Sequence, residues 1–181
     1  MKKLKVTVFL FLLLCSFNLI AQDTIPVSQA SSKTTLGLGL GLDYGGVGAN
    51  MLVYTNKNIG FFGGFGYAVA GIGFNAGTKI RIVSEKHFTD PYFLAMYGYN
   101  AAIKIKGAEG YNKLFYGPTF GFGLDFRTKR VKKGYWTVAL LVPIRSSDVN
   151  EYIDAMKSDG VEFKNELLPI TYSIGYRFTM K

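Results

Sequence analysis

Cysteine, histidine and charged residues are all scarce in this chain. One cysteine and one histidine among 181 residues exclude a disulfide-stapled scaffold and leave no ligand cluster from which a zinc or iron site could be built. Charged residues make up only 18% of the chain and hydrophobic residues 49%, a composition that excludes an intrinsically disordered protein. We therefore expect one folded domain, with no cofactor and no metal site.

Long apolar runs are also absent, except at the N-terminus. The run from Val6 to Ala21 follows a segment with three lysines and precedes Gln22. A basic segment, an apolar segment and a small residue, in this order, are typical of a secretory signal peptide. We predict that residues 1–21 are removed by cleavage between Ala21 and Gln22, and that 22–33 form a short periplasmic segment.

Two alternatives to cleavage are disfavoured but stay open. An uncleaved anchor would need about 20 apolar residues to cross the membrane, and this run is shorter. A lipid anchor on Cys15 would need a small residue before the cysteine, where Leu14 stands. Since an exported chain meets little nucleic acid, the formal net charge of +9 does not indicate a nucleic-acid partner.

Alternation of apolar with small or polar residues dominates the rest of the chain. In 168–180 every even position is apolar, and the same period of two recurs in 36–44, 72–82 and 120–127. This period is typical of β-strands with one apolar face. Turn residues and changes of phase divide the chain into eight predicted strands, at about 35–44, 47–55, 59–70, 71–83, 92–106, 113–127, 135–144 and 167–179.

The second face of these strands is mostly glycine, which suits a crowded interior better than a solvated surface because it packs nothing there. Ten residues in a strand tilted by about 45° span about 24 Å, the height of the apolar band of outer-membrane barrels. Aromatic residues gather toward the predicted strand ends, as in membrane-interface girdles: Tyr44, Phe61, Tyr92, Phe93, Tyr116, Phe126, Tyr135, Trp136, Tyr176 and Phe178. We predict an all-β fold, an eight-stranded antiparallel up-and-down transmembrane β-barrel over 34–180, with short turns and one longer outer loop that carries a short helix.

Charged residues in the predicted strands fall on the face that we assign to the interior. They are Lys79, Arg81, Lys104, Lys106, Asp125, Arg127 and Arg177. A lysine or arginine on the lipid face would cost about 2–4 kcal/mol at the membrane midplane, so this placement supports an apolar outer surface. We expect Lys79, Arg81, Asp125, Arg127 and Arg177 to form a charge cluster in the lumen with Asp125 as its sole carboxylate, and Lys104, Lys106 and Asp43 to lie toward the outer end.

The C-terminal residues add a more specific pattern. Ser173, Gly175, Phe178 and Met180 resemble the assembly signal of Gram-negative outer-membrane barrels, although an aromatic residue is commoner at the position of Met180, and Lys181 follows the usual end. The mature chain thus resembles the small eight-stranded outer-membrane β-barrel proteins of Gram-negative bacteria, including porin-like ones. The resemblance implies an outer-membrane location, contact with outer-membrane lipid, and recognition by the barrel-assembly machinery during insertion.

The predicted outer loop, 146–166, holds half of the 12 acidic residues. Helical spacing brings Asp148, Glu151 and Asp154 together, and Ser147 is the expected N-cap of the helix. The face opposite the acids is apolar, with Val149, Ile153 and Met156. One interpretation is a calcium site or a site for an envelope protein partner. The other is a solvated helical cap over the outer mouth, since the acids lack the EF-hand order.

Catalytic chemistry has little support in the sequence. His87 lies near Ser84 and Asp90 in a short polar turn, where such a combination is expected by chance, so we predict a non-enzymatic protein. We favour a structural or surface role in which the barrel presents a loop to a partner. The alternative is a narrow porin-like transport barrel or a small-ligand-binding barrel; a membrane-embedded lipid enzyme is a third class.

Overall fold

The computed structural model of the protein describes residues 34–83, 88–105, 109–127, 134–161, 163 and 167–180. The predicted cleavage site between Ala21 and Gln22, the predicted periplasmic segment 22–33, His87, Lys106 and Lys181 lie outside these residues. Within the described part of the chain, no helix is both long and apolar enough to cross a membrane.

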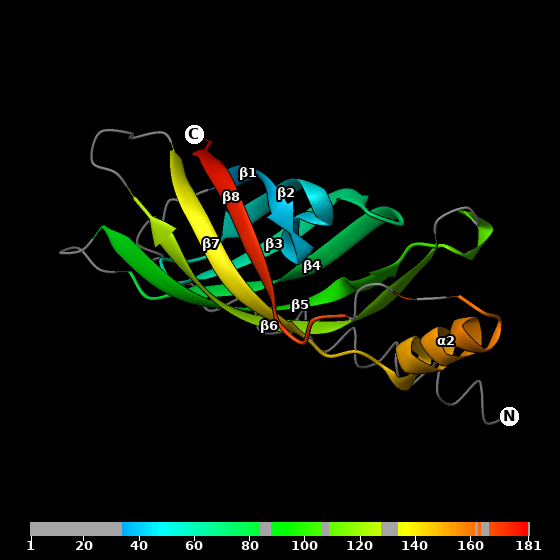
Figure 1. The fold of residues 1–181 in the computed structure, drawn as a ribbon. Coiled ribbons are helices and arrows are strands. Elements are labelled where there is room, and N and C mark those ends of the chain that lie inside the picture. Colours follow the sequence, from blue (N-terminus) through cyan, green and yellow to red (C-terminus); the bar gives the residue numbers. More distant parts are fainter. Residues whose placement is uncertain are drawn as a thin grey trace, which may run out of the picture. The chain divides into compact units, whose positions relative to one another are not determined.

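Eight strands form a closed barrel in which each strand pairs antiparallel with its sequence neighbours, and β1 closes the barrel against β8 (Figure 1). The strands are β1 (Thr34–Gly41), β2 (Gly46–Tyr54), β3 (Ile59–Ala68), β4 (Gly71–Arg81), β5 (Thr89–Ile103), β6 (Lys113–Phe126), β7 (Gly134–Pro143) and β8 (Thr171–Thr179). The described chain also contains the 3-10 turns η1 (Leu42–Tyr44) and η2 (Glu109–Tyr111) and the helix α2 (Ser147–Ser158). The predicted all-β, eight-stranded antiparallel up-and-down barrel is confirmed.

The alternation seen in the sequence becomes the two faces of the barrel wall. In β8, Ser173 and Arg177 point inward and are buried, whereas Tyr172 and Ile174 point outward and are exposed. This strand begins at Thr171, four residues later than predicted from the pattern. Pro169 lacks the N–H that a strand ladder needs, and the Arg145 side chain instead donates a hydrogen bond of 2.7 Å to the carbonyl of Leu168.

The first strand ends earlier than its apolar period predicts. The chain leaves β1 at Gly41, turns inward as η1 and returns through Gly45, which has the left-handed φ of 70° that favours glycine. Leu42 and Tyr44, both predicted on the outer face, are only 7% and 0% exposed. The prediction of a strand up to residue 44 is therefore wrong.

The hairpin of β5 and β6 extends beyond its neighbours. Residues 99–103 pair with 113–116 but not with β4 or β7. A bulge between Tyr99 and Ala101 changes the phase of β5, so that Ile103 is buried and Lys104 is exposed. The prediction that Lys104 faces the interior is wrong, because the bulge adds one residue on β5 and reverses every later side chain.

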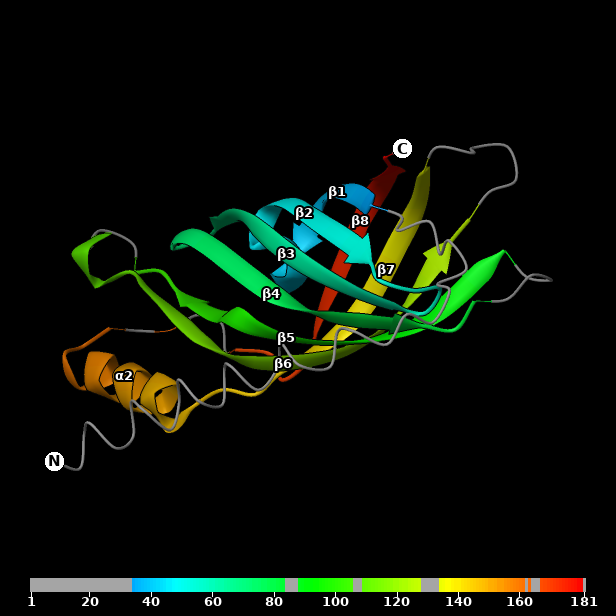
Figure 2. The ribbon, with the colours of Figure 1, turned by 180° about the vertical axis from the view of Figure 1, so that it is seen from behind.

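The helix α2 lies alongside this extended hairpin in both ribbon views (Figures 1 and 2). It begins after the N-cap Ser146, one residue before the predicted cap Ser147, and no side chain caps it. Its apolar face is the predicted one, and the resulting core lies between the helix and the hairpin: Ala101, Ile103, Ile105, Phe115, Val149 and Met156, with Ile153 packed against them. The hairpin and α2 are therefore one packed unit, at the end of the barrel opposite the start of β1 and the end of β8 (Figure 1).

Candidate functional site

The interior of the barrel contains a piece of the chain itself. The turn η1 lies inside the wall, and three side chains from three different strands hold it. Asn50 of β2 donates a hydrogen bond of 2.6 Å to the carbonyl of Asp43, and Asn75 of β4 donates one of 2.6 Å to that of Leu42. Ser173 of β8 donates its hydroxyl to the Asp43 carboxylate. We call Leu42, Asp43 and Tyr44 the plug.

Inward glycines make room for the plug. The ring of Tyr44 lies so close to β1 that a Cβ on Gly39 would come 2.7 Å from the ring carbon Cε2, and one on Gly37 would come 3.1 Å from Cε1. A Cβ on Gly64 of β3 would overlap the carbonyl oxygen of Asp43. The prediction that the glycine face is a crowded interior is confirmed, and what crowds it is backbone as well as side chains.

Of the aromatic residues predicted for the girdle, Tyr44 and Tyr135 are buried instead, and Tyr92, whose side chain is also expected to fill the lumen, is buried as well. Tyr92 and Tyr135 occupy inward positions of β5 and β7, and their place near a strand end was a misleading signal. The hydroxyl of Tyr92 lies 2.8 Å from the Thr137 hydroxyl and donates a hydrogen bond of 3.2 Å to the carbonyl of Val138. A buried tyrosine can stay inside the barrel because its polar end finds such partners.

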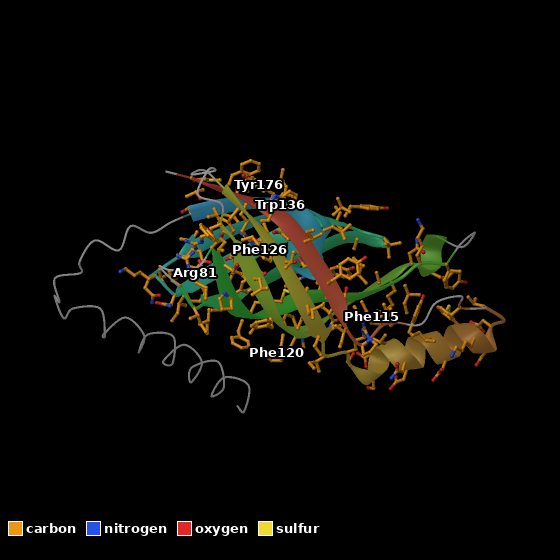
Figure 3. The ribbon with its side chains drawn as sticks, turned by 60° about the vertical axis from the view of Figure 1, so that its left-hand side comes forward. Arg81, Phe115, Phe120, Phe126, Trp136 and Tyr176 are labelled. Carbon is orange, nitrogen blue, oxygen red and sulfur yellow. The ribbon has the colours of Figure 1, made fainter. Side chains whose placement is uncertain are left out.

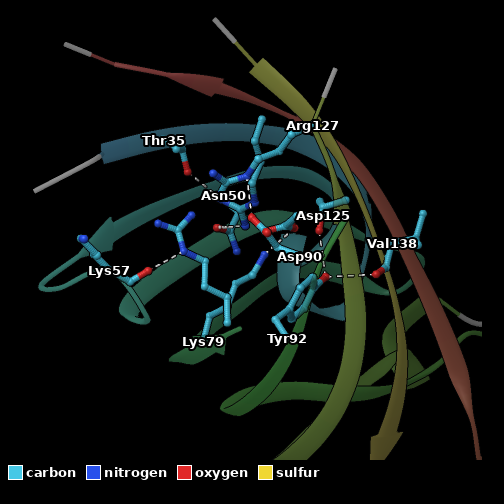
Figure 4. A network of polar contacts seen from close by, with 12 residues as sticks. Thr35, Asn50, Lys57, Lys79, Asp90, Tyr92, Asp125, Arg127 and Val138 are labelled. Carbon is cyan, nitrogen blue, oxygen red and sulfur yellow. Dashed lines mark hydrogen bonds and ion pairs between the residues drawn. The ribbon is translucent and has the colours of Figure 1, made fainter. Parts of the chain in front are cut away.

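Two ion pairs lie on the inner face of the barrel, toward the end where β1 begins and β8 ends (Figure 4). Lys79 Nζ is 2.7 Å from Asp125 Oδ1, and the two side chains are 4% and 0% exposed. Arg127 Nε is 2.8 Å from Asp90 Oδ2. The prediction that Asp125 is the sole carboxylate of the cluster is therefore wrong, because Asp90 is a second one. Asp90 was assigned to a turn, but β5 already begins at Thr89 and turns Asp90 inward.

Arg177 and Arg81, the other predicted members of the charge cluster, have no carboxylate partner among the described residues. Arg177 donates hydrogen bonds of 2.7 Å to Asn50 Oδ1 and 3.3 Å to the Thr35 hydroxyl. Arg81 Nε donates one of 2.8 Å to the carbonyl of Lys57, and its guanidinium lies 3.7 Å from the centre of the buried Tyr54 ring. The cluster thus contains two ion pairs and two guanidinium groups held by neutral acceptors.

The acidic residues of α2 lie on its solvent side, where Asp148, Glu151 and Asp154 are all exposed. Among the described residues, no group of three or more histidine, cysteine or acidic side chains is arranged to hold a metal ion. The proposed calcium site therefore gains no support from the geometry of the helix.

The residues of the predicted assembly signal lie on both faces of β8 and just beyond it. Ser173 and Gly175 face the interior, and Phe178 and Met180 are 46% and 40% exposed. Gly175 has a packing role of its own, because a Cβ at this position would overlap the Tyr44 ring. Recognition by the assembly machinery stays a prediction.

Sequence reasoning missed the plug and its anchors. The sequence predicts only a turn at Gly45-Gly46, and it places Asn75 on the polar face of its strand without assigning a partner to Asn75 or Asn50. Two amides on inward positions are the signal that could have indicated it, because buried amides need hydrogen-bond partners. No protein-family model matches the chain, and no curated protein matches it either.

We predict that Gly64→Ala destabilises the protein by about 1–3 kcal/mol, because the new methyl group overpacks against the plug. Gly63→Ala is the matched control, since its Cβ would point outward and meet nothing within 4 Å. Urea unfolding followed by the fluorescence of the single tryptophan measures both. Equal stability of the two variants would show that the plug does not press on β3.

We predict that Lys79→Met or Asp125→Asn alone costs about 3–5 kcal/mol, because each leaves an uncompensated buried charge. The double variant should lose clearly less free energy of unfolding than the two single variants lose together. The same urea measurement gives this difference as the coupling energy of the pair. Lys157→Met, on the exposed side of α2, serves as the control and should change little. Additive losses would mean that the pair is not coupled.

Proposed function

We propose that the protein is an integral outer-membrane β-barrel protein, non-enzymatic, with a structural or surface role in which it presents the hairpin of β5 and β6 with α2 to an envelope partner. The observation that carries the proposal is the distribution of side chains across the wall. Charges are inside the barrel, and large apolar side chains surround its outside. Lipid is the surrounding that favours this arrangement.

The apolar outer surface involves all eight strands. Leu38, Met51, Phe65, Phe74, Phe93, Phe120, Leu140 and Ile174, one from each strand, are between 44% and 67% exposed. Phe120 is among the side chains that project from the outer wall in Figure 3. Soluble monomers rarely expose a contiguous apolar patch of more than a few hundred Å². A continuous apolar wall therefore supports contact with the acyl chains of outer-membrane lipid.

Strand lengths and aromatic placement support the same surroundings. A tilted strand crosses the membrane with about 9–11 residues, and β3, β4 and β7 contain 10, 11 and 10. Trp136 and Tyr176 lie on the outer face with their ring centres 5.3 Å apart (Figure 3). The ring of Phe178, near the end of β8, follows at 4.9 Å from that of Tyr176. Such clusters are typical of the membrane–water interface.

The filled interior favours a structural or presenting role over transport. An eight-stranded barrel is only wide enough for side chains to fill it, and here the plug adds backbone to the same space. At the other end, the core between α2 and the hairpin gives the projecting unit a defined shape, with Val149 only 1% exposed. With the termini in the periplasm, this unit would face outward.

We predict that Phe120→Arg reduces stability in lipid by about 2–4 kcal/mol, because its outward position lies far from both ends of the barrel. Phe126→Arg, on the same face at the end of the same strand, should cost only about 0–1 kcal/mol, because an arginine there reaches the interface. Urea unfolding in phospholipid vesicles, and the gel mobility of boiled and unboiled samples, measure the difference. A barrel surrounded by water would tolerate both changes equally.

We predict no stable conductance above baseline when the purified protein is inserted into planar bilayers, because the plug and the lumen side chains fill the interior. A general porin in the same bilayer is the positive control, and recovery of the protein in the outer-membrane fraction tests its location. A reproducible open channel would contradict the role proposed here and favour transport.

A further inference from the structure

The charges inside the barrel do not balance. Among the described residues, the buried cations Lys79, Arg81 and Arg177 and the partly exposed Arg127 lie with three buried carboxylates, those of Asp43, Asp90 and Asp125. Lys79 forms an ion pair with Asp125, and Arg127 forms one with Asp90. The Asp43 carboxylate accepts a hydrogen bond from the Ser173 hydroxyl. Two guanidinium groups therefore remain without a carboxylate among the described residues, although burying an unpaired charge is costly.

Arg177 is held in place with donor capacity to spare. Its side chain is only 3% exposed, both of its hydrogen-bond acceptors, Asn50 and Thr35, are neutral, and its Nε is buried without a hydrogen-bond partner. An arginine with neutral acceptors only is expected to attract an anion, because a guanidinium makes its strongest hydrogen bonds to charged oxygens.

Arg81 supplies a second guanidinium at the same end of the barrel. It is the last residue of β4 and is 6% exposed, and Nε makes the one hydrogen bond that its side chain has within the described residues. Within the described residues, its two terminal nitrogens donate no hydrogen bond to a side chain or a carbonyl, so they are the donors that Arg81 can offer to a ligand.

Each of the two arginines lies beside a buried tyrosine, Arg81 beside Tyr54 and Arg177 near Tyr44. Tyr54, the last residue of β2, is 2% exposed, and its hydroxyl is buried without a hydrogen-bond partner. The Arg81 guanidinium lies 3.7 Å from the centre of the Tyr54 ring. The Tyr44 hydroxyl of the plug also lacks a hydrogen-bond partner among the described residues, and the Arg177 guanidinium lies 5.8 Å from the centre of the Tyr44 ring. Arg177 Nε and the hydroxyls of Tyr54 and Tyr44 are thus hydrogen-bond donors without an acceptor in the described part of the chain. An oxyanion could accept hydrogen bonds from such donors.

We propose that Arg81, Arg177 and the Tyr54 hydroxyl form a binding site for a phosphate-type oxyanion inside the barrel, at the end where β1 begins and β8 ends. Two guanidinium groups suit a tetrahedral anion because each presents a planar pair of donors to two oxygens. Free inorganic phosphate and a phospholipid headgroup present the same chemistry. The site lies inside the barrel, away from the outer wall and from α2. The proposal therefore goes beyond the role proposed above and does not depend on it.

The test uses the mature protein in micelles of a maltoside detergent, which contains no phosphate. The unfolding midpoint is measured against inorganic phosphate, with chloride added to keep the ionic strength constant. A ligand that binds only the folded state raises the midpoint in a saturable way. We expect this rise for the wild type, and about a tenfold or greater loss of apparent phosphate affinity in Arg81→Gln, since hydrogen bonds to charged groups contribute about 1.5–3 kcal/mol.

Lys157→Gln is the matched control, because it removes the same charge from the exposed side of α2 and should leave the phosphate response unchanged. Arg177→Gln is a second variant; Arg81→Gln keeps the test decisive if the loss of the Asn50 contact prevents Arg177→Gln from folding. In a parallel arm, short-chain phosphatidylglycerol replaces free phosphate. A rise in that arm that Arg81→Gln abolishes supports binding of the headgroup as well, and a rise with free phosphate alone supports the free anion. The proposal is overturned if neither phosphate source raises the midpoint beyond chloride, or if Arg81→Gln and Lys157→Gln respond alike.

Discussion

The docking of the plug against inward glycines is the contact on which the rest of this structure depends. An eight-stranded barrel encloses a space that side chains alone can fill, and here Tyr44 and two backbone carbonyls enter it as well. Gly37, Gly39 and Gly64 leave the room that this requires. Asn50 and Asn75 donate hydrogen bonds to the carbonyls of the plug. The inward glycines therefore give the plug its space, and the two amides satisfy its buried backbone.

The same filled interior explains where the charges lie. Lys79 and Asp125 face each other at 2.7 Å inside the wall, while the outer wall is apolar on every strand. Asn50 links the two regions of the lumen, because it accepts from Arg177 and donates to the plug. Occupation of the proposed anion site would therefore bear directly on a side chain that also anchors the plug.

A filled barrel with a projecting unit differs physically from an open one. The proposed role implies that the interior transmits no solute while the plug stays in place. The projecting unit lies at the end opposite the start of β1, where the hairpin core buries Val149 and Met156. The proposed function assigns the role to that unit and to the outer wall. The proposed anion site lies at the opposite end, so the two ends of the barrel would serve different purposes.

The period of two along the sequence determined the strand count, the antiparallel order and the faces of residues such as Phe74, Lys79 and Ile174, because a strand presents alternate residues to opposite sides. The apolar spacing of Val149, Ile153 and Met156 likewise determined the helix. Only the tertiary structure decided that Tyr44 turns inward, that a bulge exposes Lys104, and that Asp90 pairs with Arg127. Those outcomes depend on space and partners supplied by strands distant in the chain, and a local pattern carries no information about either.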